Sequence, residues 1–157
     1  MKIAFWYIGK STPSFVVDGI SEYEKRMKHY VNYESHCFPH VKNASKLPPK
    51  ELKRKESEMI LAKMDKNDHL FVLDEHGTEY KSVDFAKSVE QWMVSYSGRL
   101  IFLVGGAYGI EKNLLSQARK KISLGKATYS HQVIRIMFLE QLYRAFTILR
   151  GEKYHNE

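Results

Sequence analysis

The chain has 157 residues, of which 43% are hydrophobic and 27% charged, and its formal net charge at pH 7 is +7. This length and composition are typical of one globular domain, residues 1–157, and they argue against a disordered or low-complexity chain. A basic balance of this size favours a polyanionic partner through phosphate contacts, with a merely basic surface as the alternative.

Cysteine content and apolar runs bear on where the protein works. Cys37 is the only cysteine, so no intramolecular disulfide can form, and a reducing compartment is expected. The apolar run at residues 3–8 is too short for a signal-peptide core and far too short for a membrane span. The histidines include no set at metal-ligand spacing with the cysteine. We therefore expect a cytoplasmic protein with no membrane contact and no metal site.

Strands and helices are predicted to alternate along the chain. The first strand is expected at residues 2–8, where aromatic and β-branched residues run without interruption, and a helix follows from Thr12 to Met27. The alternation predicts an α/β fold with a five-stranded parallel sheet that helices cover on both faces. The remaining elements are expected as strand 31–38, helix 49–64, strand 69–73, helix 82–96, strand 99–104, helix 110–119, strand 120–124 and helix 133–149.

A glycine-rich turn, Gly105 to Gly109, follows the strand at 99–104, and its backbone could approach a ligand closely. The glycines lack the spacing of a dinucleotide-binding fingerprint, and the turn is not a phosphate-binding loop. The polar loop 123–130 would meet this turn if strands 99–104 and 120–124 were neighbours. Together with the acidic turn 74–77, the two would make a pocket built mostly from backbone. The alternative is that the glycines only let strand and helix pack.

The last helix carries the charged residues Arg135, Glu140 and Arg144 among apolar ones. Charges are rarely placed where a helix packs unless they pair or act. Arg144 and Glu140 stand at positions i and i+4 and could form an ion pair, alone or alongside catalysis. Arg135 could reach phosphate or a partner subunit, and His131 is expected to be structural. Apolar residues on more than one face of this helix favour a second subunit covering part of it.

The helix at residues 49–64 is the most heavily charged element, with Lys50, Lys53, Arg54 and Lys55 close to several glutamates. Its basic residues could contact phosphate. We expect instead a solvated face on which opposite charges balance.

Five motifs together resemble one known family. They are LDEHG at 73–77, FLVGGAYG at 102–109, SLGKATYSHQ at 123–132, EQLYRA at 140–145 and YH at 154–155. In this order, and over the whole chain, they closely resemble the RlmH family, small SPOUT-class methyltransferases of bacterial large-subunit ribosomal RNA. The chain departs from the usual family pattern, which has Ser, Met, Pro and a basic residue, at Gly125, Ala127, Ser130 and Asn156.

The resemblance implies both a fold and a reaction. The fold is a SPOUT-type parallel sheet with a C-terminal trefoil knot, in a homodimer. The reaction is methylation of N3 of a pseudouridine in the helix 69 loop of 23S ribosomal RNA, with S-adenosylmethionine as donor, the assembled ribosome as substrate, and neither DNA nor a metal involved. Carried over by motif, the donor pocket is formed by Leu73, Gly105, Leu124, Gly125, Lys126, Ala127, Thr128 and Tyr129.

Four residues are the predicted catalytic group: Arg144, His155, Tyr154 and Glu140. N3 of the base carries a proton, so a group must remove it or stabilise the resulting anion. Arg144 could stabilise that negative charge, and His155 could accept the proton. Tyr154 could stack on an extruded base, and Glu140 would pair with Arg144. The alternatives are a disordered tail for His155 and packing of the tail onto the body for Tyr154.

Two other functions agree with part of the pattern. A non-enzymatic ribosome- or RNA-binding α/β protein would explain the charge but neither the glycine turn nor the polar loop. A nucleotide-binding α/β enzyme of another class is disfavoured by the missing phosphate-binding loop. Absence of S-adenosylmethionine binding would favour the first, and nucleotide binding would favour the second.

Overall fold

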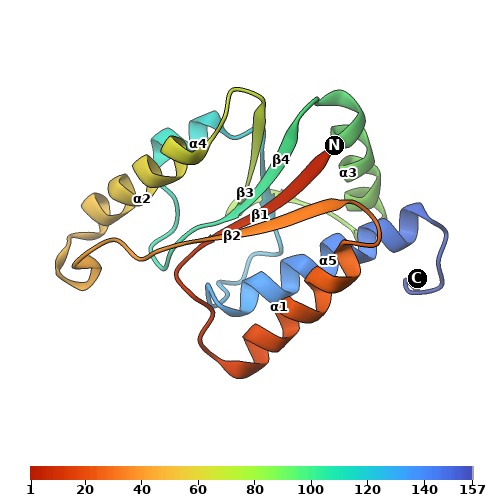
Figure 1. The fold of residues 1–157 in the computed structure, drawn as a ribbon, viewed down its shortest axis with the longest axis horizontal. Helices are drawn as coiled ribbons and strands as arrows, with labels where there is room; N and C mark the ends of the chain where they lie inside the picture. The colour runs from red at the N-terminus through yellow and green to blue at the C-terminus, as the bar shows by residue number, and fades with distance from the viewer. Residues whose placement is uncertain (157) are drawn as a thin grey trace.

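Five parallel strands form one sheet in the computed structural model, which describes residues 1–156 (Figure 1). Their order across the sheet is β2-β1-β4-β3-β5, and each neighbouring pair is parallel. The α/β class and the five-stranded parallel sheet predicted from the sequence are confirmed. The strands are β1 (Lys2–Ile8), β2 (Asn32–Phe38), β3 (Asp68–Glu79), β4 (Arg99–Val104) and β5 (Lys120–Ser123).

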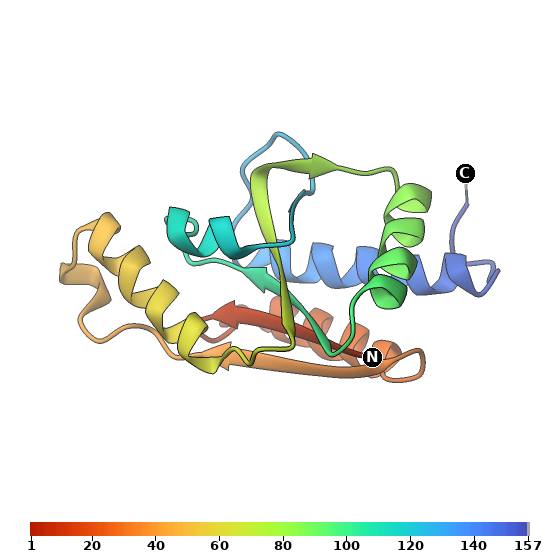
Figure 2. The same cartoon turned by 90° about the horizontal axis from the view of Figure 1, so that it is seen from above.

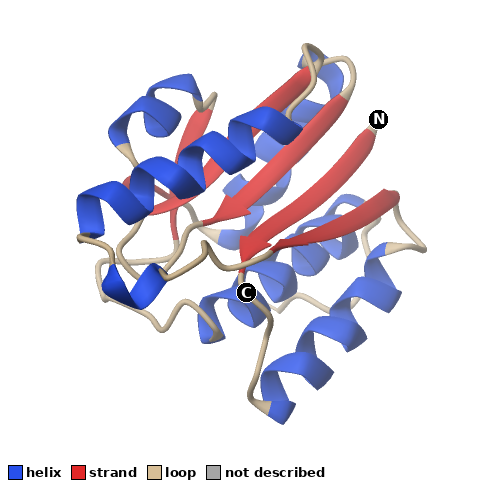
Figure 3. Cartoon of the chain, turned by 60° about the vertical axis from the view of Figure 1, so that its left-hand side comes forward, coloured by secondary structure: helices blue, strands red, loops and turns tan. Residues whose placement is uncertain are grey.

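Helices cover both faces of this sheet (Figures 1 and 3). One face carries α1, α3 and α5, and the opposite face carries α2 and α4. The helix expected at 110–119 is confined to its central turns in α4. The helices are α1 (Ser14–Met27), α2 (Pro49–Lys63), α3 (Ser82–Ser95), α4 (Lys112–Gln117) and α5 (Val133–Leu149), with a short 3-10 helix at Ala44–Lys46.

Each central strand supplies side chains to two cores, because alternate residues of a strand point to opposite faces. Phe5 of β1 packs on Phe138 of α5, with ring centroids 5.6 Å apart. Its neighbour Trp6 belongs to the other core, which also contains Ile60 of α2 and Leu114 of α4. Burial on both faces explains why β1 and β4 read as continuous apolar runs, and their predicted boundaries are confirmed.

The third strand is longer than the sequence pattern predicted. The acidic stretch expected to be a turn at 74–77 is a bulge inside β3: both Leu73 and Thr78 pair with Ile122 of β5. Figure 2 shows the sharp bend that β3 makes toward its far end. A Cβ on Gly77 would lie 2.5 Å from the backbone of Lys121, so glycine is what lets the strand return to β5.

The chain returns from the sheet edge at β5 to the helical layer, where α5 packs against both α1 and α3. Phe138, Leu139 and Phe146 are buried within this one chain. The expectation that a second subunit is needed to cover these faces of α5 was therefore wrong for those residues. The trefoil knot implied by the family resemblance stays a prediction. No helix within residues 1–156 combines the length and the hydropathy needed to cross a bilayer.

Candidate functional site

Three loops meet at the carboxyl edge of the sheet around a cavity of about 780 Å³. They are the β3 bulge, the glycine turn after β4 and the loop after β5. Strands β4 and β5 are not neighbours, because β3 lies between them, so the condition stated for the meeting of their loops is not met. The loops still meet because all the strands are parallel and end at one edge. The pocket predicted from these three segments is therefore present, and we refer to it as the donor cavity.

Most of the residues predicted to hold a methyl donor line the donor cavity. They are Leu73, Gly105, Leu124, Gly125, Ala127, Thr128 and Tyr129. Lys126 does not line it, and its side chain is exposed. Lys53 of α2 and Lys112 of α4 do line it, although the sequence indicated only a solvated helix for the first.

The loop after β5 is held by its own polar side chains. The Ser123 hydroxyl donates to the Gly125 carbonyl at 2.8 Å and accepts from the Gly125 N–H at 3.1 Å. Gly125 has φ +129°, a conformation that side chains rarely adopt, so glycine fits this position better than the serine usual in the family. Thr128 donates to the Glu75 carboxylate at 3.2 Å and thereby ties the loop to the β3 bulge.

Two glycines of the turn leave no room for a side chain. A Cβ on Gly105 would lie 2.5 Å from Ile110, and one on Gly106 would lie 2.8 Å from the Glu56 carboxylate. Glu56 is buried, and burial raises the pKa of its carboxyl to about 7. The charge pattern of α2 did not indicate that the Glu56 side chain is buried near Gly106.

The predicted catalytic residues come together on the C-terminal half of α5. Arg144 forms an ion pair with Glu140 and donates to Nδ1 of His155 at 3.2 Å. The Tyr154 hydroxyl donates to the same Glu140 carboxylate at 3.0 Å. The Arg144 guanidinium lies 4.7 Å from the centre of the Tyr154 ring. The tail thus folds back onto α5, as one alternative for Tyr154 proposed, and joins the ion pair expected for Arg144 and Glu140.

These contacts define donors and acceptors. Arginine has no acceptor, so Nδ1 of His155 accepts the hydrogen bond from Arg144. Burial, with the hydrogen bonds to Tyr23 and Glu140, raises the pKa of Tyr154, which stays a neutral hydroxyl. The group therefore presents a cation, an imidazole and an aromatic ring.

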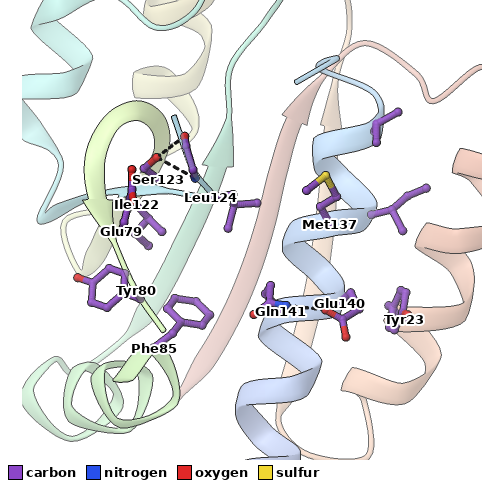
Figure 4. A pocket seen from close by; sticks show the side chains of 13 residues that line it. Tyr23, Glu79, Tyr80, Phe85, Ile122, Ser123, Leu124, Met137, Glu140 and Gln141 are labelled. Atoms are coloured by element: carbon purple, nitrogen blue, oxygen red, sulfur yellow. Dashed lines mark hydrogen bonds between the residues drawn. The ribbon is translucent and has the colours of Figure 1, made fainter. Parts of the chain in front are cut away.

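A second cavity, of about 500 Å³, lies beside the donor cavity, and Figure 4 shows the side chains that line it. Leu124 and Gly125 line both cavities, and Glu140 lines the second one. Ser82 and Gln141 also take part here, because Ser82 donates to Gln141 at 3.0 Å and Gln141 donates to Glu140 at 2.8 Å. The signal for Gln141 in the sequence was a polar residue within an apolar helical stripe.

Arg135 has a structural role that the sequence did not decide. Its side chain is 0% exposed, so it cannot reach a phosphate or a partner subunit. It donates to the carbonyls of Ile8 at 2.7 Å and Gly9 at 2.8 Å, and lies 4.5 Å from the centre of the Tyr7 ring. Burial lowers the pKa of Arg135, and burial beside this arginine lowers the pKa of His131, which lines the donor cavity. Arg135 thus fastens the end of β1 to α5.

No group of three or more potential metal ligands occurs among residues 1–156.

The chain resembles known proteins over nearly its whole length. A family profile described as "Predicted SPOUT methyltransferase" matches residues 1–155. Two relatives are named ribosomal RNA large subunit methyltransferase H. The protein from Parabacteroides distasonis is 43% identical over 157 residues, covering 100% of both chains. The protein from Cytophaga hutchinsonii is 42% identical over 156 residues, covering 99% of this chain and 100% of its own. The chain therefore belongs to the SPOUT methyltransferase family, as the motifs at its three loops and on α5 predicted.

Proposed function

We propose that this protein transfers a methyl group from S-adenosylmethionine to N3 of a pseudouridine in the helix 69 loop of 23S ribosomal RNA, in the assembled ribosome. The names of the two full-length relatives assign to them methylation of large-subunit ribosomal RNA. One structural observation carries the proposal for this chain. The donor cavity and the cavity that reaches Glu140 share the wall formed by Leu124 and Gly125, so donor and catalytic group can act on one acceptor.

The donor cavity fits a ligand held mainly by backbone groups. Gly105, Gly106 and Gly109 line it without side chains, so their backbone groups can approach a ligand closely. Leu73, Gly105 and the loop 124–129 would hold S-adenosylmethionine, apart from the outward side chain of Lys126. The bound cofactor supplies an electrophilic methyl group on a positively charged sulfur.

Arg144 and His155 would act together on the N3 proton. In the resting arrangement Arg144 occupies the lone pair of His155 Nδ1, so this nitrogen cannot accept a proton. When Arg144 turns to a carbonyl oxygen of the base, it stabilises the negative charge there and frees Nδ1 to take the proton. Glu140 keeps the guanidinium near its place during this exchange, and the half-buried ring of Tyr154 stacks on the base.

A homodimer completes the proposal. Phe15 and Val17 at the start of α1 are 61% and 45% exposed, and a second subunit would cover them. The substrate is the assembled ribosome, so the reaction takes place in the cytoplasm.

The test is methyl transfer to ribosomes. Purified protein and labelled S-adenosylmethionine are incubated with ribosomes that lack the modification, and the methylated nucleotide is mapped by mass spectrometry. The proposal expects one methyl group on N3 of a pseudouridine in the helix 69 loop. Tight, site-specific methylation of a short isolated hairpin would contradict the ribosome requirement, and no methylation despite cofactor binding would contradict the proposed substrate.

A further inference from the structure

The cavity of about 500 Å³ beside the donor cavity has a mixed lining. Tyr80 and Phe85 contribute aromatic rings on one side, with centroids 5.8 Å apart. Met137 and Gln141 of α5 lie on the other side, and Figure 4 shows the two sides facing each other across the opening. A flat ring with polar edges fits such a lining better than a wholly apolar or wholly charged ligand does.

The position of this cavity suits an acceptor. Methyl transfer requires the acceptor nitrogen to lie close to the donor sulfur and in line with the bond that breaks. Leu124 and Gly125 separate the cavity from the donor site, and Glu140 links its other end to Arg144. A base held here would therefore lie between the donor and the group that stabilises its anion.

Gln141 is held in one orientation. Its carbonyl oxygen accepts from the Ser82 hydroxyl at 3.0 Å, and its NH₂ group donates to Glu140 at 2.8 Å. An amide has two N–H donors and two acceptor lone pairs, so one donor and one acceptor remain free. A pseudouridine ring offers the complementary pair, its C2 carbonyl next to N1–H, and N3 then remains free to react.

We infer that this second cavity is the site of the acceptor base, and that Gln141, oriented by Ser82, recognises the C2 carbonyl and the N1–H of the pseudouridine ring. Tyr80 and Phe85 line the side of the cavity opposite Gln141. The inference rests on the proposed function and specifies where its substrate binds. The polar groups in the lining favour a nucleobase over an apolar side chain from a second copy of the chain, which is the competing occupant.

Four variants test the inference. Val133→Trp fills the cavity, because Val133 lines this cavity and not the donor cavity, and Val94→Trp on exposed α3 surface is the matched control. Gln141→Ala removes the recognising amide. Ser82→Ala removes the hydroxyl that orients the Gln141 amide, and Ser82→Thr supplies a hydroxyl at the same position.

The measurements are S-adenosylmethionine affinity by calorimetry and kcat and KM for ribosome methylation. We expect Gln141→Ala to lower kcat/KM by about 10- to 100-fold, because the base edge is left unpaired, with donor affinity within about twofold of the wild type. Val133→Trp should lose methylation but keep donor binding, and Val94→Trp should match the wild type. Ser82→Ala should lose part of the activity, and Ser82→Thr should regain it.

Wild-type methylation rates for Gln141→Ala and Val133→Trp would overturn the inference. So would conversion of a wild-type dimer to a monomer by Val133→Trp, because a partner side chain would then be the occupant. Failure of the wild-type protein itself to methylate ribosomes contradicts the proposed function, and the inference falls with it. The wild-type and variant reactions therefore distinguish the two failures.

Discussion

Arg144 donates to Nδ1 of His155 at 3.2 Å while its guanidinium is paired with Glu140. The Nδ1 lone pair of the imidazole is thereby occupied, and the cation is held beside it. When a base in the second cavity reaches them beside Glu140, the guanidinium turns to its carbonyl oxygen, and Nδ1 of His155 is free to accept a proton. Arg144 and His155 therefore act together in the proposed reaction.

Replacing Arg144 tests its proposed role in catalysis. Arg144→Ala should lower kcat for ribosome methylation by about 10²- to 10³-fold, because a fixed donor no longer stabilises the anion. Arg150→Ala is the control, since this exposed arginine contacts Tyr30 and the carbonyl of His29 and no residue of the catalytic group. Equal rates for the two variants, measured with saturating ribosomes, would be incompatible with a catalytic Arg144.

Two variants of Tyr154 distinguish the role of its ring in stacking from the role of its hydroxyl in hydrogen bonding. Tyr154→Phe keeps the ring but loses the hydrogen bond to Glu140, and we expect kcat/KM to fall less than about fivefold. Tyr154→Ala loses the stacking face and should lower kcat/KM by about 10- to 100-fold. If both variants lose the same activity in the ribosome assay, the hydroxyl and not the ring carries the role.

Glu56 makes the stability of the protein fall as the pH rises. Burial raises the pKa of its carboxyl from 4.5 to about 7, so the folded protein keeps a proton that the unfolded chain releases. This stabilisation is complete below pH 4.5 and is lost as the pH rises through about 7. Glu56→Gln should therefore be more stable than the wild type by roughly 2 kcal/mol at pH 8, and the difference should shrink toward pH 5.

Urea unfolding at several pH values measures this difference. Glu58→Gln, which changes a 62% exposed side chain on the same helix, is the control and should follow the wild type. Parallel pH profiles for Glu56→Gln and the wild type would show that the carboxyl beside Gly106 has an ordinary pKa.

Arg135 should matter for stability. Arg135→Met leaves the carbonyls of Ile8 and Gly9 buried without their donors, and the free energy of unfolding should fall by roughly 1–3 kcal/mol. Arg119→Met changes an exposed arginine and should have little effect. Equal urea midpoints for the two variants would contradict a structural role for Arg135.

The sequence predicted what local patterns encode. Continuous apolar runs located β1 and β4 to the residue, because strands buried on both faces leave no polar alternation. The pattern misjudged β3, because the polar bulge before Thr78 has the composition of a turn. The placement of β3 between β4 and β5 was missed, because pairing between distant strands leaves no local signal.

The candidate site likewise contains residues that the sequence predicted and residues that only the structure reveals. Motifs identified Arg144, Glu140, Tyr154 and His155, and the fold brings them together. The roles of the other charged residues depend on whether their side chains are buried. Arg135 and Glu56 both stand in charged or mixed stretches, and only three-dimensional packing shows that their side chains are buried. The contacts of Gln141 depend on Ser82 from another helix, which no spacing rule connects.

Calorimetric titration with S-adenosylmethionine of the wild type and of Gly105→Val tests the central claim most directly. The valine places side-chain atoms in the space now bounded by Ile110, in the wall of the donor cavity. Thermal unfolding of both proteins establishes that the variant is folded. The account predicts micromolar binding by the wild type and none by the folded variant. Equal affinity in both proteins would contradict the assignment of the donor to the glycine turn.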